Sequence, residues 1–225
     1  MNETMERPVA DQDALPAWIR RWGIGFLAFV VLSTIGVVAF AVFRPILVLP
    51  RMSLAPGSAL VDQRGETLTS AELRGAVTLY TFSYTSCETA PCAAVDSVMR
   101  AVHERLGELD GGTIPVRLVT ISFDPERDTP AVLAAIPSQR GADPTVWSWT
   151  TGDPAMLKNV IGGNFEVFFE ERDDGTFRFD PAFVLVDGTG IIRARYRVGI
   201  PKPDKLLDDI ALILKEAQAS SGFAR

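Results

Sequence analysis

Residues 76–92 read AVTLYTFSYTSCETAPC, and this stretch decides the fold. Residues 76–84 are uncharged and rich in β-branched and aromatic side chains, which is typical of a strand buried on both faces. The strand runs directly into Cys87, and Pro91 marks the first position of a helix. Cys92 then falls in the first turn of that helix. The sequence therefore predicts a strand–loop–helix unit that contains both cysteines of the chain.

The segments around this unit continue an alternation of strands and helices. Capping signals at Asp128-Thr129-Pro130 and at Asp153-Pro154 each predict a further helix. The remaining predicted elements are a hairpin at 59–69, strands at 116–123, 182–187 and 191–198, and a C-terminal helix at 204–218. This order predicts an α/β fold, with a mixed sheet flanked by helices. A cysteine that ends a strand and opens a helix in such a domain is the thioredoxin-like arrangement.

Composition limits the function classes. The chain has 225 residues and a net charge of −6, from 22 basic and 28 acidic side chains. A nucleic-acid partner requires a basic footprint, so the acidic balance argues against one. Two cysteines are too few for a disulfide-dense scaffold, and no second pair or Cys/His cluster is present to form a zinc site.

An uncharged apolar run, WGIGFLAFVVLSTIGVVAFAVF, occupies residues 22–43. As a helix it spans about 30 Å, the thickness of a bilayer core, and it is longer than the apolar part of a cleaved signal peptide. The arginines around it favour a cytoplasmic N-terminus: Arg7, Arg20 and Arg21 precede it, and Arg44 and Arg51 follow. The predicted organisation is a cytoplasmic tail at 1–21, a single-pass cell-membrane anchor at 22–43, a linker at 44–58, an extracytoplasmic (periplasmic) domain at 59–219 and a tail at 220–225.

The two cysteines are five positions apart, which on an α-helix separates their directions by about 140°. Cys87 must therefore precede the helix if the sulfurs are to meet. Amides at a helix start lower the pKa of a thiol, and a pair of thiolates selects Cu(I) over harder ions. Cys87 and Cys92 are thus candidates for a redox dithiol and for copper ligands. A structural disulfide and two unrelated buried thiols are the alternatives, although so short a loop gains little from a disulfide.

Four segments resemble, in order, motifs of the Sco/SenC family. The most specific is ISFDPERDTPAVL (121–133), which is very close to S-x-D-P-x-R-D-T-P. The others are SAELRGAVTLYTFSYTSC (70–87), with F-x-Y-T-x-C, WSWTTGDPAMLKNVI (147–161), with W-x-x-x-T-G-D, and FEVFFEERDDG (165–175). The resemblance covers roughly 59–219 and the anchor. It implies a membrane-anchored, thioredoxin-fold copper chaperone or cytochrome c oxidase assembly protein.

The chain departs from the family pattern at two places. The family spaces its cysteines C-x-x-x-C, whereas this chain has C-x-x-x-x-C, and the family's ligand histidine is absent before residues 182–187. The only histidine, His103, lies on the helix after the cysteines and is expected at the helix surface or core edge. Phe179, Asp180 and Pro181 stand where the ligand is expected. Asp180 offers a carboxylate, a poor match to Cu(I), and we hypothesise a cis Asp180–Pro181 bond facing the dithiol.

Other residues complete the predicted site. Asp124, Arg127 and Asp128 are, by resemblance, a loop that positions the cysteines, but for Asp128 helix capping is the preferred interpretation. Met99 fits the apolar helix face and is predicted to be core. Met52 lies in the linker and cannot be assigned from the sequence.

The predicted function is a Sco-like dithiol protein that assists assembly of the copper site of cytochrome c oxidase by thiol–disulfide exchange and Cu(I) binding. Its expected partners are the membrane and the copper-bearing oxidase subunit or another extracytoplasmic thiol protein. A general thiol–disulfide oxidoreductase and a non-catalytic accessory subunit are the alternatives. A peroxiredoxin is excluded, because Tyr80 and Tyr84 stand where its P-x-x-x-[TS]-x-x-C motif needs Pro and Thr or Ser.

Overall fold

The computed structural model describes residues 17–43 and 48–222, and the chain divides into two units, Met1–Leu47 and Val48–Arg225. The described part of the first unit is the helix α1 (Ala17–Phe43). Within the two described ranges, no helix is long and apolar enough to cross a membrane. The predictions for residues 1–16, 44–47 and 223–225 lie outside the described residues.

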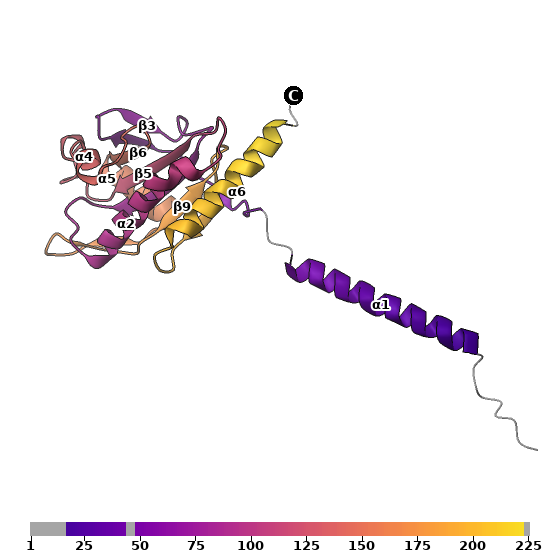
Figure 1. Cartoon of the computed structure of the whole chain (residues 1–225). Coiled ribbons are helices and arrows are strands. Elements are labelled where there is room, and N and C mark those ends of the chain that lie inside the picture. Colours follow the sequence, from indigo (N-terminus) through magenta and orange to yellow (C-terminus); the bar gives the residue numbers. More distant parts are fainter. Residues whose placement is uncertain (1–16, 44–47, 223–225) are drawn as a thin grey trace, which may run out of the picture. The chain divides into compact units, whose positions relative to one another are not determined.

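A mixed sheet organises the second unit (Figure 1). Its strand order is β1-β10-β9-β4-β5-β6-β2-β3, and β4 pairs in parallel with β5 and antiparallel with β9. The strands are β1 (Ser53–Leu54), β2 (Ala59–Asp62), β3 (Thr67–Thr69), β4 (Val77–Ser83), β5 (Val116–Ser122), β6 (Trp147–Thr151), β9 (Phe183–Val186) and β10 (Ile191–Tyr196). A separate hairpin joins β7 (Phe169–Glu171) to β8 (Phe177–Phe179).

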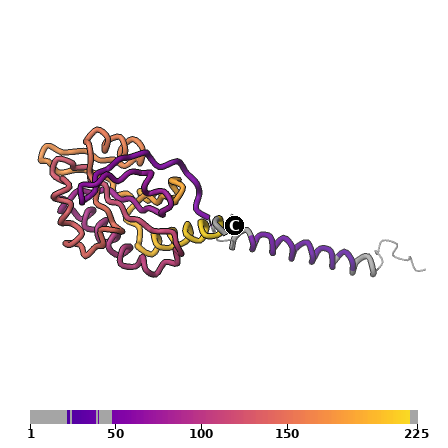
Figure 2. The backbone as a smooth tube through the Cα atoms, turned by 90° about the horizontal axis from the view of Figure 1, so that it is seen from above, coloured from indigo at the N-terminus to yellow at the C-terminus, as the bar shows by residue number. Residues whose placement is uncertain are grey.

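Helices cover both faces of the sheet. The long helices α2 and α6 contact each other and lie side by side in Figures 1 and 2. The helical elements are α2 (Ala90–Arg105), η1 (Leu106–Glu108), α3 (Pro130–Leu133), α4 (Ile136–Arg140), α5 (Pro154–Lys158), the π-helical η2 (Asn159–Asn164) and α6 (Pro203–Gly222).

Alternation along β4 divides the core into two clusters. Val77 and Leu79 face α2 and α6, while Tyr80 and Phe82 face η2 and the β7–β8 hairpin. All four side chains are buried, because β4 is a central strand with a neighbour on each edge and a packed layer on each face. The strand that ends in the cysteine loop is therefore rigidly held.

The predicted α/β fold with a mixed sheet is confirmed, and the strands and helices predicted for the second unit are present within a few residues. The helix α2 begins at Ala90, one residue before the predicted start at Pro91. The sequence reading did not assign β1, which lies inside the segment predicted to be a linker and pairs with β10 at the sheet edge. The sequence analysis also predicts no strand at residues 147–151, where the structure has β6.

A buried arginine fixes the segment that leads into β1. Arg193 is 2% exposed and donates from Nη1 to Asp187 at 3.1 Å. Its Nη2 donates to Glu216 and to the Leu49 carbonyl, each at 2.6 Å, and its Nε donates to the Pro50 carbonyl at 3.3 Å. These residues, the Arg193 network, tie β10 and α6 to backbone that precedes the sheet.

Candidate functional site: a disulfide between a strand and a helix

Cys87 and Cys92 form a disulfide, with their Cα atoms 6.0 Å apart. Cys92 is buried in the first turn of α2, while Cys87 is half-buried in the loop before it, as the helix-geometry argument predicted. Cys87 Sγ lies 3.2 Å from Thr89 Oγ1, and Thr89 is the residue immediately before α2. The sulfur of Cys87 is therefore the one that a partner can reach.

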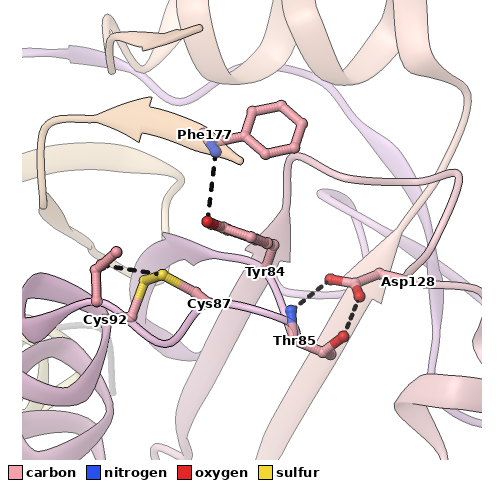
Figure 3. The surroundings of a disulfide bond; sticks show 7 residues. Tyr84, Thr85, Cys87, Cys92, Asp128 and Phe177 are labelled. Atoms are coloured by element: carbon pink, nitrogen blue, oxygen red, sulfur yellow. Dashed lines mark hydrogen bonds between the residues drawn. A yellow bond between two sulfur atoms is a disulfide. The ribbon is translucent and has the colours of Figure 1, made fainter. Parts of the chain in front are cut away.

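A buried carboxylate holds the loop before Cys87 (Figure 3). Asp128 is 0% exposed and accepts hydrogen bonds from the Thr85 N–H at 2.9 Å and from the Thr85 hydroxyl. It also accepts one from the Ser122 hydroxyl at 2.6 Å. Thr85 lies two residues before Cys87, and Ser122 ends β5. Asp128 thus connects the cysteine loop to the sheet.

The preferred interpretation of Asp128 as a helix cap is wrong. Thr129 is the N-cap of α3, and its hydroxyl accepts from the Val132 N–H at 3.4 Å. A carboxylate with two hydroxyl donors and one amide donor inside the protein is satisfied where it is, so its direction is set by Thr85 and Ser122 rather than by the helix. The reading of this loop as a positioning element is the one that the contacts favour.

Asp124 and Arg127 form an ion pair in the same loop. Arg127 also donates to the Gly175 carbonyl at 2.5 Å and lies 5.8 Å from the centre of the Phe177 ring. The loop that contains Asp128 is therefore joined to the β7–β8 hairpin as well.

A cavity of about 160 Å³ lies on the α2 side of the disulfide and is lined by both cysteines and Asp128. Its floor is formed by hydroxyl side chains at the carboxyl ends of β4 and β5, where Thr81 pairs with Thr120 and Ser83 with Ser122. Its walls are apolar or charged: Val95, Asp96, Met99, Leu133, Ile136, Arg140, Trp147 and Trp149. Thr120 accepts from the Trp147 indole at 2.9 Å, so this floor is ordered.

Aromatic rings occupy the other side of the cysteine loop. The Tyr84 hydroxyl accepts from the Phe177 N–H at 3.4 Å (Figure 3), and the Tyr84 ring lies 5.2 Å from Phe123. Phe179 stands 5.1 Å from Phe123 and belongs to the same cluster, which also contacts Cys87. Rings therefore fill the region where the sequence comparison expected a ligand from residues 179–181.

The cis-proline hypothesis is wrong. The described residues contain no cis peptide bond, so Asp180–Pro181 is trans. The Asp180 N–H donates to the Phe168 carbonyl at 3.1 Å, and this pairing continues the extended backbone of β8 toward β9, for which the trans form is favoured. Asp180 is exposed and Pro181 half-buried, and neither lines the cavity beside the cysteines.

His103 and Met99 lie where the sequence predicts them, and Met52, which the sequence could not assign, lies near β1. His103 Nε2 accepts from the Asp143 N–H at 3.2 Å at the edge of the core, as predicted. Met99 is 0% exposed, as predicted for a core residue, and lines the cavity. Met52 is 50% exposed near β1. Within the described ranges no three His, Cys, Asp or Glu residues form a group that could hold a metal.

Replacing Asp128 by asparagine is expected to lower the free energy of unfolding by about 2–3 kcal/mol. The new amide group faces donors, and Thr85 and Ser122 lose a charged acceptor. Urea unfolding of the full chain in detergent, followed by tryptophan fluorescence, measures the loss. Asp153→Asn is the matched control, because Asp153 is an exposed helix cap and asparagine caps equally well. A loss below about 0.5 kcal/mol for Asp128→Asn contradicts the positioning role.

The chain resembles proteins of one family. A family model described as SCO1/SenC matches residues 53–215. A SCO2-like protein of Rickettsia felis is 39% identical over 137 residues, which are 58% of this chain and 63% of that protein. A SCO2-like protein of Rickettsia prowazekii is 31% identical over the same shares. The match spans less than two thirds of the length of these relatives.

Solved structures agree. Bradyrhizobium japonicum ScoI with copper bound is 28% identical, with a TM-score of 0.53 over 73% of this chain and 99% of that one. BsSco, described as a member of the Sco family of cytochrome c oxidase assembly proteins with a disulfide switch, is 21% identical, with a TM-score of 0.64 over 75% and 98% of the two chains. At that identity BsSco supports the thioredoxin-like fold alone.

Proposed function

This chain belongs to the SCO1/SenC family, and on that premise we propose that it is a membrane-anchored dithiol protein that assists assembly of the copper site of cytochrome c oxidase. Its chemistry is thiol–disulfide exchange at Cys87 and Cys92, together with Cu(I) binding by the reduced pair. The observation that carries the proposal is the disulfide that joins the loop after β4 to the first turn of α2, with Cys87 half-buried and Cys92 buried.

The exchange reaction follows from this difference in exposure. In the reduced protein the Cys87 thiolate attacks a disulfide of the partner, which forms a mixed disulfide and releases one partner thiolate. Cys92 then attacks Cys87 Sγ, which forms the Cys87–Cys92 disulfide and releases the second partner thiolate. Two electrons pass to the partner, whose paired cysteines become able to bind copper.

Copper is the cargo in this proposal, and the residues fit only part of the family's site. Two thiolates suit Cu(I) in two-coordinate geometry, whereas Cu(II) prefers four nitrogen or oxygen ligands. His103 bonds to Asp143, and aromatic rings occupy the region of residues 177–179. We infer that the reduced pair binds Cu(I) and does not retain Cu(II). Thiol–disulfide exchange, which transfers two electrons to the partner, is then the main function.

The anchor rests mainly on the sequence. Residues 22–43 contain no charge, and as a helix they would span about 30 Å. On α1 the side chains of Trp22, Phe26 and Leu32 are 77%, 71% and 69% exposed, which favours an apolar environment around this helix. In this proposal the N-terminus lies in the cytoplasm and the second unit lies on the other side of the membrane.

Anaerobic titration of the reduced full chain with Cu(I), in competition with a Cu(I) chelator, tests the copper half of the proposal. We expect one Cu(I) per chain, lost in Cys87→Ser and in Cys92→Ser, and no Cu(II) that survives gel filtration. The chain with His103→Ala is the matched control and should bind Cu(I) as the parent does. Absence of Cu(I) binding would leave only the exchange reaction, and loss of binding in His103→Ala would overturn the two-thiolate site.

A further inference from the structure

A second pocket lies at the opposite end of the sheet order from β3, where β1 meets the end of β10. It has a volume of about 550 Å³ and is open to solvent. Met52, Glu166, Arg195, Arg197 and Val198 line it, and we call it the arginine pocket. It shares no lining residue with the cavity beside the disulfide.

The pocket has an unsatisfied cationic donor. Arg195 Nε is buried, and among the described residues it donates to no partner, while Arg195 Nη2 makes only a long 3.3 Å bond to the Ser53 hydroxyl. Buried donors without acceptors are rare in folded proteins, and the other N–H groups of this guanidinium can donate to an anion at the pocket. Arg197 adds a second cation at the same pocket.

Among the described residues that line the pocket, Glu166 alone carries a carboxylate, and its backbone conformation is unusual. Glu166 has φ of 57°, and no other non-glycine residue of the described ranges has positive φ. It ends η2, where the Phe165 N–H donates to Val160 and the Val167 N–H to Ile161, and glycine or asparagine normally takes this position. Glutamate at this position places its carboxylate 2.5 Å from Arg197 Nη2. Glu166 thus forms an exposed ion pair with Arg197, which another anion could replace.

Apolar side chains surround the charges. Val198 is 101% exposed, Leu54 61% and Met52 50%, and all three lie on β1, next to it or just after β10. Cations with exposed apolar neighbours are typical of surfaces that contact the headgroup region of a membrane.

The backbone that leads into this pocket is fixed to the sheet. The Arg193 network holds the carbonyls of Leu49 and Pro50, and Met52 donates its N–H to Ile192. In the sequence, five residues lie between the end of α1 at Phe43 and this fixed backbone, which begins at Leu49. If α1 is the anchor, as proposed above, the same chain tethers the second unit, and this pocket with it, to the membrane.

We propose that the arginine pocket binds the phosphate of anionic lipid headgroups, with Arg195 and Arg197 as the binding groups and Glu166 as the group that the phosphate displaces. Val198, Met52 and Leu54 contact the interface around it. The inference rests on the proposed anchor for its location and is independent of the cysteine chemistry.

Hydrogen exchange of the full chain in lipid nanodiscs tests the proposal. We expect amides of residues 197–200 to exchange about tenfold more slowly in discs with phosphatidylglycerol than in discs of phosphatidylcholine alone. The double variant R195Q/R197Q should lose this difference, and Glu166→Gln should enlarge it. The matched control, R100Q/K158Q, removes two positive charges from the exposed surfaces of α2 and α5 and should behave as the parent does.

Three other outcomes of this experiment bear on the proposal. Equal exchange in both discs, or an unchanged difference in R195Q/R197Q, overturns the proposal. Protection by inorganic phosphate in phosphatidylcholine discs, equal to that by phosphatidylglycerol, shows a free-anion site and overturns the lipid assignment. If the chain enters neither disc and is extracted by alkaline carbonate, the proposed anchor is wrong. The same exchange measurement, with phosphatidylglycerol vesicles added to the chain, then tests lipid binding by the arginine pocket separately.

Discussion

Reduced Cys92→Ser is expected to form a stable mixed disulfide with oxidised glutathione, whereas Cys87→Ser should react at least about 100-fold more slowly. Cys87 is half-buried in a loop and is the sulfur that we expect to attack. Cys92 is 6% exposed beneath it and can only resolve the mixed disulfide. The parent should release two equivalents of reduced glutathione, Cys92→Ser one equivalent, and Cys87→Ser almost none.

The number of thiols released and the mass of the protein adduct measure this outcome. Ser86→Ala is the matched control, because Ser86 is an exposed neighbour of Cys87 and takes no part in the exchange. A stable adduct on Cys92 in Cys87→Ser, together with an unreactive Cys92→Ser, would reverse the two roles. If neither variant differed from the parent in thiol release, exchange at this pair would be excluded.

Replacing Arg193 by methionine is expected to lower the free energy of unfolding by about 3–5 kcal/mol. Methionine keeps much of the volume but leaves Asp187 and Glu216 without their cation and the Leu49 and Pro50 carbonyls without a donor. Arg193→Lys should lose less, since it keeps the charge but not the planar fork of donors. Urea unfolding in detergent gives these values.

Arg197→Met is the matched control for this prediction. Arg197→Met breaks an ion pair between exposed side chains and should lower the free energy of unfolding by at most about 1 kcal/mol.

The stability of the Arg193 network should also depend on pH. Burial raises the pKa of Asp187, but hydrogen bonds from Thr189, Ile191 and Arg193 outweigh this effect and lower that pKa overall. Because the pKa of Asp187 is lower in the folded chain, its carboxylate contributes to the free energy of unfolding above about pH 4. This contribution is lost as the pH falls further. Arg193→Met should therefore lose less stability on acidification than the parent, and an equal loss would contradict the network.

Much of the fold could be predicted because its signals are local. The uncharged, β-branched run at 77–83 and the Asp-Pro and Thr-Pro caps each specify one element without reference to the rest. The edge strand β1 could not be found in this way. Ser53–Leu54 is short and follows prolines, and it becomes a strand only because β10 presents an unpaired edge more than a hundred residues later.

The cysteines were found from the sequence, but the residues that hold them were not. The sequence favours helix capping for Asp128 because the adjacent Thr129 and Pro130 give a complete cap signal, whereas its actual donors include Thr85, which is distant in sequence. One signal was available: threonine and serine recur two positions apart in both buried strands, at Thr81 and Ser83 and at Thr120 and Ser122. The cis-proline hypothesis failed because it was carried over from other thioredoxin folds and had no local signal of its own.

The position of β4 has a consequence for the order of folding. Its parallel neighbour β5 follows within about 40 residues, but Leu79 pairs with Leu185 on β9, about 100 residues later. Closing that separation costs more chain entropy than any other contact of β4, so the sheet cannot be completed until almost the whole domain has been synthesised. The two cysteines are separated by only five positions. If the domain is exported, as proposed above, the cysteines can therefore meet an oxidant, or copper, while the central strand still lacks its last partner.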